Sequence, residues 1–152
     1  MLPPNALPKS GRKLMSEEST ATDLVERVRV ILEAADRADF DTILTFYAPD
    51  AVWELRAGGT FKGLAAIRGL WEDYYAAYEE FEIEVEELLD FGRGVILAVN
   101  QQKARPFGST AHVRTREAFM YQWRDGLVVR VTMYDDIGEA RAAAERLAEE
   151  RE

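Results

Sequence analysis

Four β-rich segments follow one another in the second half of this chain, and the tight connections between them limit the possible folds. The first segment alternates, with Phe81, Ile83 and Val85 on one side and glutamates between them, which is typical of a half-exposed strand. The predicted strands cover residues 81–89, 95–103, 111–123 and 127–135, with turns at 92–94 and 124–126. Consecutive strands joined by hairpins pair antiparallel, so the sequence predicts an α+β protein rather than an α/β protein.

The first half of the chain supplies helices and two short strands. The predicted elements are helices over 20–37, 40–47 and 64–78, strands over 51–55 and 60–62, and a terminal helix over 137–151. Three helices packed against one curved sheet form a cone that encloses a cavity. Such a cavity is a common place for a small-molecule site.

Composition excludes several classes of function. The net charge of −9 disfavours nucleic acid and anionic membrane surfaces as partners. The absence of cysteine excludes disulfides, thiolate nucleophiles and zinc–sulfur sites, and His112 is the single histidine. We expect no metal and no cofactor, because the acidic strand lacks the spacing of a metal site and no nucleotide-binding fingerprint is present.

The N-terminal residues carry prolines and cations without an apolar stretch. We therefore expect residues 1–18 to form a disordered tail and residues 19–152 to form a single domain. A signal peptide needs an apolar segment that is missing here, which predicts a cytoplasmic protein. The segment that opens at Met15 resembles an alternative translation start, so both Met1 and Met15 stay candidates.

Several short motifs, taken in order, resemble one family. They are Ala38-Asp39-Phe40-Asp41, Tyr47-Ala48-Pro49-Asp50-Ala51-Val52-Trp53-Glu54, Gly59-Thr60-Phe61-Lys62-Gly63, Trp123-Arg124-Asp125-Gly126 and Tyr134-Asp135-Asp136 before an alanine-rich helix. Over residues 20–147 the chain resembles SnoaL-like proteins, which share the fold of nuclear transport factor 2. The resemblance implies a cone-shaped antiparallel sheet, and a homodimer formed through the outer sheet face with Val129, Val131 and Met133 in the contact.

The resemblance also implies a catalytic set. Catalytic relatives end the last strand in an aromatic residue, any residue and an Asp that faces the pocket, which corresponds here to Tyr134 and Asp136. Strand alternation places these two on one face, and Arg116 on the preceding strand is a candidate to stabilise negative charge. The alternatives are that Asp136 caps the terminal helix, that Asp135 faces the pocket instead, and that Arg116 lies on a solvated face.

We expect a ligand-binding wall that is mostly aromatic. Its predicted members are Trp53, Leu55, Trp71, Tyr74, Tyr78, Gln101, Phe119 and Thr132. Leu55 stands where ketosteroid isomerases carry a base and limonene-epoxide hydrolases an asparagine, and Phe119 where related sequences often carry a histidine.

Two hypotheses therefore stay open. One is a cofactor-free acid–base enzyme, an isomerase, cyclase, hydratase or dehydratase, that acts on an apolar oxygenated molecule. The other is a non-catalytic ligand-binding or dimerisation domain. The enzyme predicts a cavity of at least about 300 Å³ with Asp136 inside. The binding domain predicts a collapsed cavity or Asp136 as a helix cap.

Overall fold

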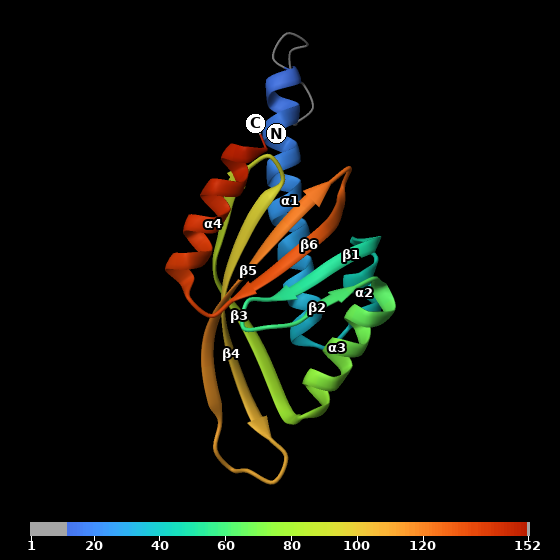
Figure 1. The fold of residues 1–152 in the computed structure, drawn as a ribbon, viewed down its shortest axis with the longest axis vertical. Coiled ribbons are helices and arrows are strands. Elements are labelled where there is room, and N and C mark those ends of the chain that lie inside the picture. Colours follow the sequence, from blue (N-terminus) through green and yellow to red (C-terminus); the bar gives the residue numbers. More distant parts are fainter. Residues whose placement is uncertain (1–11, 152) are drawn as a thin grey trace.

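The computed structural model of the chain describes residues 12–151, with side chains from Asp23 onward. Its elements, shown in Figure 1, are α1 (Arg12–Asp36), α2 (Phe40–Leu44), β1 (Tyr47–Leu55), β2 (Thr60–Lys62), α3 (Leu64–Ala76), β3 (Tyr78–Gly92), β4 (Val95–Pro106), β5 (Val113–Arg124), β6 (Leu127–Tyr134) and α4 (Ile137–Glu150). The α+β class is confirmed. Helix α1 begins eight residues before the predicted start at Thr20, and residues 1–11 of the predicted tail lie outside the described residues.

The strands form one curved sheet in the order β2-β1-β6-β5-β4-β3. The four long strands pair antiparallel, as the tight turns predict, whereas β1 runs parallel to β6. The hairpin pattern of the second half carries no information about how a strand from the first half joins, so this parallel pair was not predicted. It places the end of β1 beside the end of β6, with Leu55 opposite Met133.

The two faces of the sheet bury two separate cores. On the concave face, α1 packs Val28, Ile31 and Leu32 against strand residues that include Phe119 and Tyr121. On the other face, α4 packs its small residues Ala140, Ala144 and Ala148 against a second set of strand side chains: Val95, Leu97, Val99, Ala118, Met120 and Tyr134. Alanines allow the helix to lie close to the sheet. Figure 1 shows α1 running behind the sheet and α4 along its side.

This arrangement corrects the predicted dimer contact. Val131 is fully buried in the core of the concave face and Met133 packs against that core, so neither lies on the outer face. That outer face is covered over β4 and β5 by α4. The oligomeric state itself stays a prediction.

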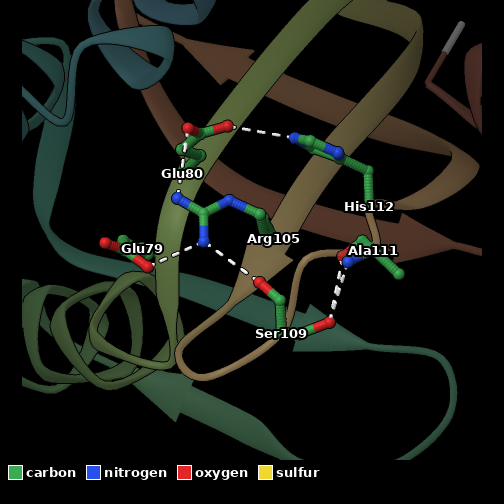
Figure 2. A network of polar contacts seen from close by, with 6 residues as sticks. All are labelled: Glu79, Glu80, Arg105, Ser109, Ala111 and His112. Atoms are coloured by element: carbon green, nitrogen blue, oxygen red, sulfur yellow. Dashed lines mark hydrogen bonds and ion pairs between the residues drawn. The ribbon is translucent and has the colours of Figure 1, made fainter.

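At its far end the sheet extends as the β4–β5 hairpin, beyond the helices (Figure 1). A polar network ties this end to β3, as Figure 2 shows. The Arg105 guanidinium donates to Glu79 at 2.8 Å, to Glu80 at 3.2 Å and to the Ser109 carbonyl at 3.1 Å. The His112 ring also contacts Glu80, at 3.0 Å. The hydrogen bonds from His112 and Arg105 hold the pKa of Glu80 below its ordinary value. In the part of the chain that the structure describes, no helix is long and apolar enough to cross a membrane.

The β3–β4 turn supplies a matched test of the fold. Gly92 and Gly94 both have positive φ, at 85° and 79°. A Cβ on Gly94 would lie 2.6 Å from the Trp123 carbonyl oxygen, whereas one on Gly92 would meet nothing within 4 Å. We expect Gly92→Ala to cost about 1–2 kcal/mol through backbone strain alone. Gly94→Ala should cost about 1–3 kcal/mol more, because the turn must shift to relieve the clash. Urea unfolding of both variants measures the difference, and equal losses would contradict it.

Candidate functional site

A cavity of about 220 Å³ lies between the helices and the concave face of the sheet. Its lining is mostly apolar, and its aromatic members are Phe40, Trp71, Tyr74 and Tyr75 from the helices and Tyr47, Trp53, Phe81, Phe119 and Tyr121 from the strands. The volume is below the roughly 300–1,000 Å³ typical of sites for drug-sized ligands. It is also below the size of at least about 300 Å³ that the enzyme hypothesis predicted, so this prediction is wrong. The cavity suits a small molecule with an apolar body.

Hydrogen bonds and ring contacts hold the aromatic wall in place. The Trp53 ring lies nearly perpendicular to Trp71, with an interplanar angle of 86° and ring centroids 6.2 Å apart. Phe119 contacts the same ring at 5.4 Å. The Trp53 indole N–H donates to the Tyr47 hydroxyl at 3.1 Å, and the Tyr75 hydroxyl donates to the Ala35 carbonyl at 2.8 Å. These donors are occupied by the protein, so their rings act as an apolar wall.

Polar groups gather at the end of the cavity where β4, β5 and β6 lie side by side. Gln102 and Asp135 both belong to the lining. The Tyr74 hydroxyl donates to the Gln102 Oε1 at 2.7 Å. Arg56 also lines the cavity, but its guanidinium donates to Glu139 at 2.7 Å and lies over the Tyr134 ring. The charge of Arg56 is therefore matched outside the cavity.

Glu117 does not belong to the cavity lining but shares the strand phase of its member Phe119, and it is the main residue that the sequence analysis missed. Its side chain is 1 % exposed, and neither carboxyl oxygen has a hydrogen-bond partner among the described residues. It pairs directly with Asn100 on β4, whose amide is buried and equally unpartnered. Because Ala118 pairs with Tyr134, Glu117 falls opposite Asp135 at the end of β6. Two acids thus lie beside each other, one exposed at the opening and one buried behind it.

Burial sets the protonation of this buried acid. Loss of water, and secondarily the negative charge of Asp135, raise the pKa of Glu117 from 4.5 to about 8. Desolvation also raises the pKa of the nearby Tyr74 well above its ordinary value. At pH 7 about nine-tenths of Glu117 is therefore protonated, and Tyr74 is a neutral hydrogen-bond donor.

The structure corrects the predicted orientation of the three catalytic candidates. Asp136 is the N-cap of α4, where its side chain is exposed and accepts from the Glu139 backbone N–H at 2.9 Å. Tyr134 is buried in the core beneath α4. Arg116 is exposed and binds Glu86 at 2.9 Å. None of the three belongs to the cavity lining, and of the two adjacent acids it is Asp135 that lines the cavity.

The predicted wall divides in a similar way. Five of its eight members line the cavity: Trp53, Leu55, Trp71, Tyr74 and Phe119. The other three do not belong to the lining. Gln102 takes the place predicted for Gln101, and Thr132 instead donates to Glu54 at 3.2 Å. Tyr78 contacts the Tyr74 ring outside the lining.

Strand parity could have found Glu117. On β5, Glu117 shares the phase of Phe119, Tyr121 and Trp123, so these side chains point to one face. Arg116 has the opposite phase, so Arg116 and Phe119 could not both face the cavity. A single acid in phase with an aromatic run was the available signal.

A family model described as a SnoaL-like domain matches residues 28–131. The chain belongs to the SnoaL-like family. No curated protein matches the sequence of this SnoaL-like chain. The residues that act in the cavity must therefore be taken from this chain.

Solved structures are similar to this SnoaL-like chain in fold. Bal32a, from a soil-derived mobile gene cassette, is 19% identical with a TM-score of 0.68, over 75% of this chain and 89% of its own. TerC, co-crystallised with polyporic acid, is 16% identical with a TM-score of 0.66, over 80% and 98%. A protein from Catenulispora acidiphila with a ketosteroid isomerase-like fold, in complex with trimethylamine, is 15% identical with a TM-score of 0.65, over 72% and 84%.

Among the residues that the structure describes, no three Asp, Glu or His side chains come close enough together to hold a metal ion. His112 does not belong to the cavity lining and lies in the network of Figure 2. Asp135 is the one carboxylate in the cavity lining that the described residues form, and Glu117 lies opposite it where β5 pairs with the end of β6.

Substitutions of the two adjacent acids at the end of β6, Asp135 and Asp136, should change the free energy of unfolding by different amounts. Asp136→Ala removes the cap of α4 and should cost about 1 kcal/mol, whereas Asp136→Asn retains a capping side chain and should cost much less. Asp135→Asn should change stability little, because that side chain is exposed. Urea unfolding checks the three values. A larger loss from Asp135→Asn than from Asp136→Ala would show that the cap is misassigned.

Glu117 should make stability depend on pH in a direction opposite to that of a paired acid. Its pKa is about 8 in the folded chain, against an ordinary value of 4.5. The folded state therefore holds more protons than the unfolded state between these values, and stability falls as pH rises from 4.5 to 8. Glu117→Gln has no such carboxyl group and does not lose stability in this way. The free energy of unfolding of the variant, relative to that of wild type, should therefore rise by roughly 3–5 kcal/mol as the pH increases from 4 to 9.

Chemical unfolding of both proteins at each pH measures that gain, and Asp136→Asn is the matched control, because it removes an acid outside the cavity. A constant difference between wild type and Glu117→Gln across the pH range would show that Glu117 titrates normally.

Proposed function

We propose that this SnoaL-like chain is a cofactor-free acid–base enzyme that acts on a small apolar molecule carrying an oxygen function, with Glu117 as the proton carrier. One observation carries the proposal: a fully buried carboxyl group, without a hydrogen-bond partner among the described residues, lies two residues before the lining residue Phe119 on the same face of β5 and opposite the lining residue Asp135. A group whose pKa lies near the operating pH transfers protons efficiently in both directions.

The surrounding residues fit this role. The protonated Glu117 would donate to a carbonyl or hydroxyl oxygen of the ligand, and after ionisation it would accept a proton from carbon. Gln102 would orient the ligand through its amide, whose oxygen already accepts from Tyr74. The rings of Trp53 and Phe119 would exclude water and hold the apolar body. Isomerisation, cyclisation, hydration and dehydration all need such a proton transfer.

The second candidate is a non-catalytic binding domain. Leu55 lines the cavity at the position where catalytic relatives carry a polar group, and Asp136 caps α4, which both favour binding without turnover. Two of the compared structures hold small molecules, polyporic acid in one case and trimethylamine in the other. Their ligands therefore support a small-molecule site without deciding its chemistry.

Deuterium uptake from D₂O into the carbon next to a carbonyl tests the enzyme directly. A panel of small enones, β-diketones and aldehydes is incubated with wild type, Glu117→Gln and the control Asp136→Asn, and exchange is followed by NMR. We expect at least one compound to exchange faster with wild type, with a rate that changes around pH 8. Glu117→Gln should lose about 10²–10⁴-fold and the control should keep its rate. Binding without accelerated exchange would favour the binding domain.

A further inference from the structure

The geometry points to a ligand that carries a positive charge: we infer that the cavity binds a small organic ammonium ion, with its apolar body against the rings and its cationic group between Glu117 and Asp135. The inference rests on the proposed function only in sharing its cavity, because it concerns what binds there and holds with or without turnover.

The first argument is an imbalance of charge at the polar end. Glu117 and Asp135 lie side by side, and no ion pair joins either of them to a cation among the residues that the structure describes. Arg56, the one cation in the cavity lining formed by the described residues, is held 2.7 Å from Glu139 and lies over the Tyr134 ring. Buried acids in proteins are normally matched by a cation or a hydrogen-bond donor. A bound ammonium ion would supply that match.

The second argument is the position of the rings. Phe119 follows Glu117 by two residues on the same face of β5, a separation of about 6.6 Å along a strand. Met133 pairs with Phe119 and precedes Asp135 by two residues, so an apolar row lies directly beside the acidic row. Trp53 lies against Phe119 at 5.4 Å and nearly perpendicular to Trp71. Aromatic walls at right angles next to acids attract quaternary and protonated amines through cation–π and ionic contacts.

The third argument concerns access and size. Asp135 is exposed, whereas Glu117 is buried, so a cation would meet the outer acid first and the inner acid second. The net charge of −9 raises the local concentration of cations around the protein. A volume of about 220 Å³ admits a compact ammonium with one ring or a short chain.

The rival ligand is a neutral ketone that accepts a hydrogen bond from protonated Glu117, and pH separates the two. A cation favours ionised Glu117, so its affinity should rise with pH until the group is fully ionised. A ketone needs the protonated form, so its affinity should fall over the same range. Charge on the ligand and charge on the protein can therefore be varied independently.

Benzyltrimethylammonium and tert-butyl phenyl ketone form a matched pair of probes, similar in shape but different in charge, and neither titrates near neutral pH. Binding to the full chain is measured by calorimetry and by tryptophan fluorescence at pH 7 and pH 9. We expect the ammonium ion to bind about ten-fold more tightly at pH 9, the factor by which the ionised fraction of a group with a pKa of about 8 increases. The ketone should bind more weakly at pH 9.

Glu117→Gln should abolish the pH dependence for the ammonium ion and weaken its binding at pH 9 by about ten-fold. Asp135→Asn should weaken it at both pH values, and because that residue is exposed the variant tests the proposal even where Glu117→Gln folds poorly. Asp136→Asn is the control and should bind as wild type does.

Tighter binding of the ketone, or ammonium binding that ignores both substitutions, would overturn the inference. Ammonium binding without deuterium exchange would leave this inference standing while removing the proposed enzyme.

Discussion

The alternation of side chains along β5 determines what is buried on each of the two faces of the sheet. Phe119 and Tyr121 line the cavity on the concave side and Glu117 shares their phase, whereas Ala118 and Met120 in the other phase form the base on which α4 packs. A shift of one residue would exchange these sets, exposing the aromatic wall and burying Arg116. The register is held by the pairing with β4 and β6 on both sides. The position of the acid therefore follows from the same alternation that divides the two cores.

That division explains why the fold could be predicted from the sequence and the site only in part. The strands, their turns and the helix positions follow from local patterns, and the structure confirms the α+β class. Tyr134 and Asp136 were predicted to face the pocket because the family resemblance favours that orientation for the polar face at the end of the last strand. The cavity is apolar, so Met133 faces it, while Tyr134 packs beneath α4. Which face is covered depends on the approach of α1 and α4, and local periodicity contains no information about it.

At the end of β6, residue type alone does not predict which of two adjacent acids lines the cavity. Asp135 and Asp136 have the same side chain and adjacent positions, yet one lines the cavity and the other caps a helix. The difference is set by where β6 ends and α4 begins, within a single residue. The parallel pairing of β1 with β6 brings Leu55 and Arg56 to the same edge, which completes the opening. No motif in either strand predicts that contact, because the two strands are more than seventy residues apart.

The charge of the ligand and the chemistry of the site are linked through Glu117. In the free protein, burial and the neighbouring Asp135 keep this carboxyl protonated near neutral pH. An ammonium group placed between the two acids would reverse that balance, because a nearby positive charge favours the carboxylate. Binding would then release a proton and convert Glu117 from an acid into a base beside the apolar body of the ligand. A neutral ligand would leave the proton in place, so the same residue would respond differently to the two classes of ligand.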